Sequence, residues 1–354
     1  MSPSPVLDRL DELRETICAA DAVVPVGART QWEVGNPTTG GVAVRAPAGV
    51  LTYDPAELTV TAGAGTTVAE LGAVLGEAGQ ECPLDAGSPE ATVGGVLAAG
   101  LSGHRRLRYG PLRDRLLEVR FVTADGRLVK GGGPTVKNVT GFDLPRLLVG
   151  SLGTIGVLVR VTLRCQPRPP AASWITTTGA DPFDTRQRMF RPSCVAWDGT
   201  TTHVLLEGHP DDIVAEATWA GLDPDSAHGG AEGWPPWPEG PHRGRISVRP
   251  GRLRDLARAL DGIAGLGWLA EVGVGTVHVA ADEPAGLVAA REAATAQGGW
   301  LLREAGAPGV DGYGAQLPNL AIVERIRAAF DPGAKLSPGR LPGGPAPAAR
   351  STPD

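Results

Sequence analysis

The chain has 354 residues, of which 42% are hydrophobic and 20% are charged, and its formal net charge at pH 7 is −6. The length favours two domains over one, the composition is that of an ordinary globular protein, and the acidic balance excludes a general nucleic-acid binder. The four cysteines lie far apart and form no C-x-x-C pair, which excludes a four-cysteine iron–sulfur cluster or a zinc ribbon of familiar spacing.

The beginning of the chain has neither the basic region nor the apolar core of a secretory signal. No run in the sequence approaches the roughly 20 apolar residues that cross a bilayer. We therefore expect a cytoplasmic protein with reduced thiols, which associates with a membrane only through a partner.

The first predicted elements are a helix and a strand. The helix begins at Pro5, and Leu10, Leu13 and Ile17 share one of its faces. A strand at the start of residues 23–37 enters a loop rich in Gly, Thr, Asn and Pro, and the runs "GVAVRA" and "LTVTAGAG" that follow are typical of further strands.

The rest of the first half contains one clear helix and one clear hairpin. Residues 66–79 form a helical pattern in which Thr67 and Glu70 have the spacing of a capping box. The dipeptide Asp125-Gly126 between two apolar runs predicts a hairpin turn, and residues 153–164 predict a long strand.

A cluster of prolines in residues 165–173 interrupts the pattern and predicts a domain boundary. Beyond it, short strands alternate with helices, which is typical of a smaller α+β domain with helices on one face of a sheet. A last helix precedes a Pro/Gly-rich end. We expect domains at residues 1–168 and 173–340, and a disordered tail at 341–354.

Several familiar motifs are absent from the sequence. It contains no P-loop, no G-x-S-x-G and no H-E-x-x-H, and its six histidines form no metal-spaced cluster. The match "GLGWLA" to a dinucleotide motif does not follow a strand pattern, which argues against that function. His278 alternates with valines in "TVHVA", which favours a histidine in a sheet over a site residue.

The strongest chemical signal is a series of small-residue loops: "PVGART", "SPEATVGG", "SGHRRLRYG" and "GSLGTIG". Backbone N–H groups in glycine-rich turns bind anions, and hydroxyls and arginines add charge-assisted hydrogen bonds. Each loop alone is better explained as a tight turn. Four of them in one half of the chain favour a domain that wraps a long diphosphate cofactor.

In order along the chain, these loops and their neighbours resemble the PCMH-type FAD-binding domain of the vanillyl-alcohol oxidase family. The resemblance covers roughly residues 20–168, including "TVTAGAGTTVAELGAVLGEAGQECPLD", "ATVGGVLAAGLSG" and "VKNVTGFDLPRLLVGSLGTIGVLVRVTLR". Within that family, "LSGHRR", "VKNVTGFDLPRL" and the late "LSPGR" are most similar to the FAD-binding subunits of bacterial glycolate oxidases. The implied fold is α+β, with a two-subdomain PCMH-type FAD-binding domain followed by a smaller α+β, ferredoxin-like carboxy-terminal domain.

The resemblance also implies the residues that bind the cofactor. The expected diphosphate loop comprises Gly27, Ala28, Arg29, Thr30 and Gln31. The second loop, expected against the pyrophosphate and flavin, contributes Ser88, Thr92, Gly94 and Gly95. Its continuation near the isoalloxazine contributes Ser102, Gly103, Tyr109 and Gly110, and the adenine–ribose end is expected at Gly153, Ile155, Gly156 and Val157. The first loop lacks histidine, and His104 matches no familiar linking position, so we expect non-covalent FAD.

The implied reaction is oxidation of a small 2-hydroxy acid, with an arginine holding the carboxylate. Candidates for that arginine are Arg105, Arg106 and Arg108, for which contact with phosphate or acidic surface groups is the alternative. Lys137, Asn138 and Asp143 are candidates for facing the flavin or for a hydrogen-bonded brace. No catalytic base is identified.

In the enzymes that this chain resembles, the subunit works beside a larger FAD-binding catalytic subunit and an iron–sulfur subunit, and we expect the same partners. Two alternatives stay open: a stand-alone FAD-dependent 2-hydroxy acid dehydrogenase, and a non-catalytic assembly subunit that retains the fold. We expect no metal site. A bulky residue at Gly94 or Gly95 is expected to abolish flavin retention, whereas a change at Arg115, taken as a surface residue, is not.

Overall fold

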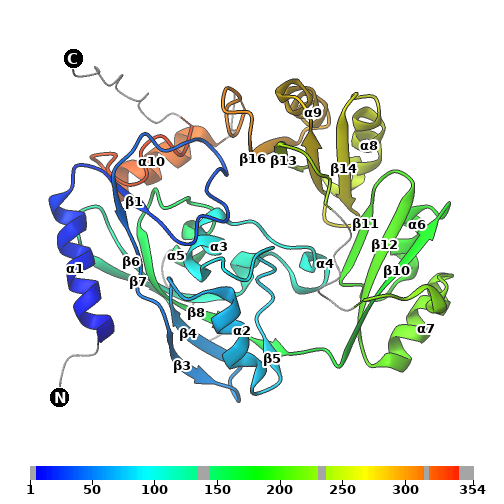
Figure 1. Ribbon diagram of the computed structural model, residues 1–354, viewed down its shortest axis with the longest axis horizontal. Coiled ribbons are helices and arrows are strands. Elements are labelled where there is room, and N and C mark those ends of the chain that lie inside the picture. The colour runs from blue at the N-terminus through cyan, green and yellow to red at the C-terminus, as the bar shows by residue number, and fades with distance from the viewer. Residues whose placement is uncertain (1–4, 134–142, 230–236, 315–318, 343–354) are drawn as a thin grey trace.

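The computed structural model describes residues 5–133, 143–229, 237–314 and 319–342. Within these residues the chain forms two large antiparallel sheets, one of five strands and one of seven. The two sheets lie in separate lobes of the molecule (Figure 1). The predicted candidates Lys137 and Asn138 and the tail from residue 343 lie outside the described residues.

The first lobe is built on the five-stranded sheet, whose strand order is β3-β4-β8-β6-β7. A parallel pair, β1 and β2, lies beside it, and the short strands β5 and β9 pair with each other. The strands are β1 (Val23–Pro25), β2 (Val42–Val44), β3 (Val50–Asp54), β4 (Thr59–Gly63), β5 (Gln80–Glu81), β6 (Leu116–Val122), β7 (Leu128–Gly132), β8 (Val157–Arg164) and β9 (Gln166–Pro167). The helices are α1 (Pro5–Ala19), α2 (Val68–Gly76), α3 (Val93–Ala99), α4 (Arg106–Tyr109) and α5 (Leu144–Leu148), with a 3₁₀ turn at Leu112–Asp114.

Two local sequence signals in this lobe are confirmed, and a predicted strand is wrong at its start. Thr67 Oγ1 accepts from the Glu70 amide at 3.1 Å and Glu70 Oε2 accepts from the Thr67 amide at 2.9 Å, which confirms the capping box. Gly126 has φ +78° in the hairpin between β6 and β7. The strand predicted from residue 153 is wrong at its start: it begins at Val157, because left-handed φ values at Leu152 (+51°) and Gly153 (+73°) turn the chain first.

The second lobe is built on the seven-stranded sheet, with strand order β10-β12-β11-β14-β15-β13-β16. Its strands are β10 (Ala171–Thr178), β11 (Cys194–Trp197), β12 (Thr201–Gly208), β13 (His242–Ser247), β14 (Leu266–Glu271), β15 (Thr276–Ala281) and β16 (Trp300–Ala305). Its helices are α6 (Pro182–Arg188), α7 (Pro210–Ala220), α8 (Leu253–Asp261) and α9 (Pro284–Ala296), with 3₁₀ turns at Pro224–Ser226 and Pro250–Arg252.

The order of these elements explains the size of the second sheet. The run β13-α8-β14-β15-α9-β16 is a ferredoxin-like βαββαβ unit, since its second, third, first and fourth strands lie in that order across the sheet. The preceding strands β10, β12 and β11 extend the same sheet through an antiparallel contact between β11 and β14. The segment "GLGWLA" is mostly strand β14, and does not form a helix-opening loop.

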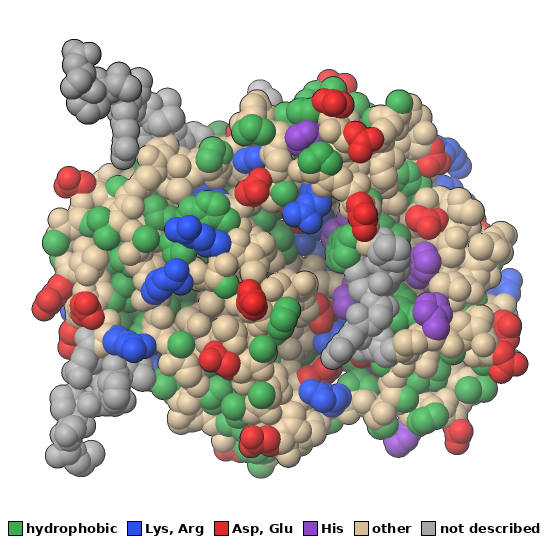
Figure 2. All heavy atoms as spheres, in the orientation of Figure 1, with side chains coloured by type: hydrophobic (Ala, Val, Ile, Leu, Met, Phe, Trp, Pro, Cys, Tyr) green, Lys and Arg blue, Asp and Glu red, His purple; other side chains and the backbone are tan. Residues whose placement is uncertain are grey.

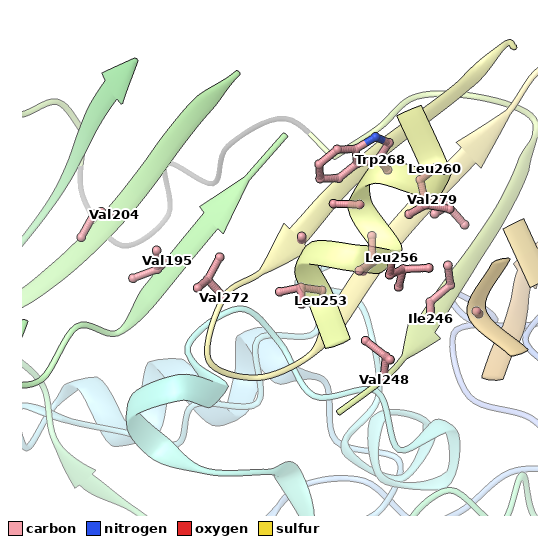
Figure 3. Packing of buried hydrophobic residues seen from close by; sticks show 14 of the residues in the cluster. Val195, Val204, Ile246, Val248, Leu253, Leu256, Leu260, Trp268, Val272 and Val279 are labelled. Atoms are coloured by element: carbon pink, nitrogen blue, oxygen red, sulfur yellow. The ribbon is translucent and has the colours of Figure 1, made fainter. Parts of the chain in front are cut away.

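One face of the seven-stranded sheet is covered by helices. Leu253, Leu256 and Leu260 of α8 are fully buried and pack toward Val279 and its neighbours on the sheet (Figure 3). Burying each such leucine stabilises the fold by about 1.5–3 kcal/mol. The opposite face of the same sheet turns toward the first lobe, and α4 contacts β11 there.

The end of the described chain returns to the first lobe. Helix α10 (Leu320–Phe330) places Phe330 6.1 Å from the Phe121 ring of β6, and Leu336 packs with α1 and β1. The sequence division at residue 173 assigned this segment to the second unit, because a helical pattern does not reveal on which sheet a helix packs. The division of the chain into domains stays a prediction.

Within the described ranges, none of the helices is long and apolar enough to cross a membrane. The same residues contain no group of three or more His, Cys, Asp or Glu side chains arranged to hold a metal ion.

Candidate functional site

The main candidate site is a cavity of about 350 Å³ in the first lobe. Its walls come from five segments: the loop after β1, the end of β2 and the residues that follow it, helix α3, the turn before β8, and the segment around Ser337 and Arg340. This volume lies within the range of small-molecule and cofactor pockets. The cavity therefore joins segments that are more than 300 residues apart in the sequence.

The loop 27–31 presents an unusual row of backbone donors to this cavity. Among the described residues, none of its five consecutive amides has a hydrogen-bond acceptor, whereas Val26 and Trp32 on either side donate to Val44 and Arg29. Arg29 has φ +62°, a left-handed conformation that directs successive N–H groups toward one point. The loop is thus a ready-made concavity for an anion.

Small residues bring the backbone of other segments close to the same space. A Cβ on Gly27 would lie 2.2 Å from Thr92 Oγ1, so no larger residue fits there. Gly95 also lines the cavity, and a Cβ there would meet only Thr92 Oγ1 at 2.9 Å. The amides of Gly94 and Gly95 donate to Ala64 O and Thr92 Oγ1. These two glycines therefore provide room for a ligand but no free donors.

Four arginines line the cavity of this otherwise acidic chain: Arg9, Arg29, Arg45 and Arg340. Arg340 is 6% exposed, and its Nη1 donates to the carbonyls of Trp32 and Val34 at 2.6 and 3.1 Å. Its guanidinium also lies 4.6 Å from the centroid of the Trp32 ring. Arg340 therefore holds the loop that carries the open amides, and the motif "LSPGR" was its only signal in the sequence.

A diphosphate-containing dinucleotide such as FAD fits this donor set. Its phosphates suit the five open amides and the arginines, and its length suits a cavity walled by glycines. The buried side-chain oxygen of Gln31 has no hydrogen-bond partner among the described residues, which leaves this amide available to a ligand.

The structure brings together most of the residues predicted to bind the cofactor, but not all. The cavity is lined by Gly27, Ala28, Arg29, Thr30, Gln31, Thr92, Gly94, Gly95, Gly153, Gly156 and Val157. Ser88 and Ile155 do not line it. A separate small hollow is lined by Ser102, Gly103, Arg105, Arg106, Tyr109 and Gly110.

Arg105 and Arg106 are neighbours in sequence with opposite environments. The Arg105 guanidinium pairs with Asp85 at 2.8 Å, with Glu81 at 3.0 Å and with Glu207 at 3.1 Å. Burial alone would lower the pKa of Arg105, but the three carboxylates outweigh burial and raise it. Since all of these contacts are made within the protein, they favour the alternative that Arg105 binds acidic groups of the chain itself. The pair with Glu207 of β12 also links the two lobes.

Arg106 has no such partners. Its side chain is partly buried and makes no ion pair or hydrogen bond among the described residues. Burial lowers the pKa of Arg106, and the charges of Glu271 and Arg245 act on it in opposite directions. Arg108 donates to the Glu207 carbonyl oxygen and approaches Ser193 Oγ at 3.5 Å. Of the three arginines proposed to hold a carboxylate, Arg106 is therefore the one whose guanidinium is available. Asp143 accepts from the Arg146 amide and caps α5, but its side chain is exposed, so it is not a buried brace.

The expectation that Arg115 is a surface residue is wrong. Its side chain is partly buried, Nη2 donates to the Tyr109 carbonyl, and Nη1 donates to Gln166 Oε1 at 3.3 Å. The sequence did not reveal this because the contact with Gln166 depends on pairing between distant strands.

A buried pair, Glu271 and His278, escaped the sequence-based search. Both lie on central strands of the second sheet, are 2% and 5% exposed, and His278 Nε2 lies 3.1 Å from Glu271 Oε1. Burial raises the pKa of the Glu271 carboxyl to about 7, which leaves it partly ionised at neutral pH, and lowers the pKa of the His278 imidazole, which keeps the imidazole neutral. His278 is a sheet histidine, as predicted, but it has an acidic partner.

Figure 2 shows that the molecule is hollowed between the lobes, with basic and histidine side chains near the hollow.

Comparison with known proteins agrees with the geometry of the cavity. Residues 7–132 match the family of FAD binding domains. Glycolate oxidase subunit GlcE of Escherichia coli is 39% identical over 166 residues, which are 46% of this chain and 47% of that subunit. D-lactate dehydrogenase of Archaeoglobus fulgidus is 42% identical over 106 residues, 30% of this chain and 24% of that enzyme. The aligned segments thus span less than half of either relative.

A solved structure of alkyldihydroxyacetonephosphate synthase shares the fold, with a TM-score of 0.63 over 93% of this chain and 74% of that one, at 15% identity. At that identity the likeness concerns the fold alone. Residues 7–132 therefore match the FAD binding domain family, and parts of the chain are similar to glycolate oxidase subunits and to D-lactate and D-2-hydroxyglutarate dehydrogenases.

Proposed function

We propose that this chain is the FAD-binding subunit of a 2-hydroxy acid dehydrogenase complex and that it passes electrons from the flavin to a partner. The observation that carries this proposal is the row of five open amides at residues 27–31, in a cavity walled by glycines and arginines. The relatives named glycolate oxidase subunit and D-lactate dehydrogenase supply the substrate class and the expectation of a complex.

The cofactor would lie with its diphosphate on the amides of loop 27–31 and with its adenine–ribose end near Gly153 and Val157. The isoalloxazine would extend toward residues 102–110, which line the small hollow beside α4. Bound FAD supplies the redox chemistry by accepting a hydride equivalent. The chain itself would bind and orient the cofactor, with the adenine–ribose end and the isoalloxazine held by different segments.

The first experiment purifies the chain and records its visible spectrum. A yellow protein that releases FAD on denaturation supports the proposal, and a colourless protein that FAD does not reconstitute contradicts it and leaves the non-catalytic assembly subunit. Glycolate or D-lactate is then added without oxygen. Bleaching only after a larger flavoprotein subunit and an iron–sulfur subunit are added supports the complex, and bleaching of the chain alone supports a stand-alone dehydrogenase.

The second experiment tests the position of the cofactor. Gly95→Val adds a side chain to the cavity wall beside Thr92 and is expected to lower the FAD content of the purified protein strongly. Gly251→Val is the matched control, because Gly251 is exposed and a Cβ there meets nothing within 4 Å. Full FAD content in Gly95→Val with normal folding would show that the cofactor does not lie in this cavity.

A further inference from the structure

A cluster of buried ionisable side chains lies on the face of the seven-stranded sheet that turns toward the first lobe. Glu271 of β14 and His278 of β15 form its centre. Arg245 of β13 stands opposite His278 in the strand register and pairs with Glu304 of β16 at 3.5 Å. From the first lobe, Arg106 and His104 both face Glu271.

Strand alternation explains how the cluster arises. In β15, Val277 and Val279 point to the helices and join the main core, so Thr276 and His278 point to the other face. In β14, Ala270 joins the core and Glu271 takes the other face. Apolar residues at these positions would stabilise the sheet more than buried ionisable ones do. A face that retains Glu271 and His278 beside a partnerless arginine is therefore better explained by chemistry than by stability.

The adjoining wall is the segment expected beside the flavin. Arg106 lines the small hollow together with Ser102, Gly103, Tyr109 and Gly110, and its guanidinium has no carboxylate partner among the described residues. Leu107 of the same helix lies 3.0 Å from a Cβ built on Gly273, in the turn that connects β14 to β15. Helix α4 thus places the Arg106 guanidinium on the face of the sheet that carries the buried carboxyl–imidazole pair.

Oxidation of a 2-hydroxy acid to a 2-oxo acid breaks the C2–H and O–H bonds: the hydride and its electron pair go to oxidised FAD, and the hydroxyl proton goes to a base. We propose that the Glu271–His278 pair is this base. Arg106 holds the substrate carboxylate, which explains why it lacks an internal partner. This inference rests on the proposed function and supplies the base that the sequence did not identify.

The surroundings of the pair agree with this role. Burial raises the pKa of the Glu271 carboxyl to about 7, so at neutral pH part of this carboxyl is ionised and can accept the hydroxyl proton, while burial keeps the hydrogen-bonded His278 imidazole neutral. The charged and titratable groups that act on it are Arg245, Glu304, Arg106, His104 and the buried Cys194 of β11. The Trp237 ring centroid lies 3.6 Å from that of His278. A substrate anion held at Arg106 would favour protonation of the pair.

The experiment titrates the FAD-loaded protein with oxalate, a carboxylate anion with no C–H bond to oxidise, in calorimetry buffers of different ionisation enthalpy. The native protein is expected to bind oxalate with a net uptake of protons, a readout that needs no turnover. Glu271→Gln and His278→Gln are expected to reduce that uptake, and Arg106→Leu is expected to weaken oxalate binding at least about tenfold, as for loss of a charge-assisted hydrogen bond.

The controls are Glu118→Gln, a buried carboxyl that pairs with Lys130 in the other sheet, and His203→Gln, a partly buried histidine near Asp198. Both are expected to bind oxalate with native proton uptake. Absence of oxalate binding to a protein with full FAD content, or native proton uptake in Glu271→Gln, would overturn the assignment while leaving the proposed cofactor site intact. A protein that takes up no FAD would instead overturn the proposed function.

Discussion

The three ion pairs that Arg105 forms with carboxylates yield the most direct prediction about stability. Arg105→Met removes one guanidinium and leaves Glu81, Asp85 and Glu207 together, at side-chain exposures of 16%, 9% and 1%. Removing one partner of a buried ion pair costs about 3–5 kcal/mol, because the remaining charge loses its compensation. Since domains of this kind are stable by about 5–15 kcal/mol in total, the variant should be close to unfolding.

The assay is urea unfolding at pH 7, followed by tryptophan fluorescence, for the native chain and for Arg105→Met. The exposed neighbour Arg113 supplies the matched control, Arg113→Met, which should change the unfolding free energy by less than about 0.5 kcal/mol. Adding Glu207→Gln to Arg105→Met should recover part of the loss, because one of the three uncompensated charges is then removed.

The result also separates two roles of Arg105. If Arg105→Met unfolds within about 1 kcal/mol of the native chain and the loss appears only in substrate binding, then the guanidinium is not the shared counter-charge of three carboxylates. The arginine would then belong to the substrate site after all, contrary to its saturated contacts here.

Three further predictions follow from single contacts. Arg340→Ala should weaken FAD binding at least about tenfold in fluorescence titration, because the carbonyls of loop 32–34 lose the cation that holds them; unchanged affinity would refute its positioning role. Thr67→Ala should lower the unfolding free energy by about 0.5–2 kcal/mol through loss of the capping box of α2, and no loss would contradict the capping contribution. Phe121→Ala should lower the same quantity by about 3–5 kcal/mol, because its ring is fully buried against α10 and Gly156; a loss below about 1 kcal/mol would indicate that the site collapses around the smaller side chain.

The sequence by itself was enough for features that depend on a few neighbouring residues. The capping box of Thr67 and Glu70, the hairpin at Gly126 and the alternation of His278 with valines are local, and each has the predicted geometry. The ordered series of small-residue loops was also sufficient to indicate a diphosphate-binding domain, because glycine allows tight turns and a close approach of the backbone to a ligand. The resemblance to a known family then implied that the cofactor is FAD.

Only the tertiary structure decided which side chains have partners. Adjacent positions in the sequence, Arg105 and Arg106, differ because Arg105 pairs with three carboxylates from distant segments, whereas Arg106 forms no ion pair with any residue that the structure describes. Arg340 reaches the Trp32 carbonyl across 308 positions, and Glu271 meets His278 only because β14 and β15 pair. Ion pairs, burial and hydrogen bonds act through space, so their effect at a residue is decided by the packing of the whole chain and not by its neighbours in sequence.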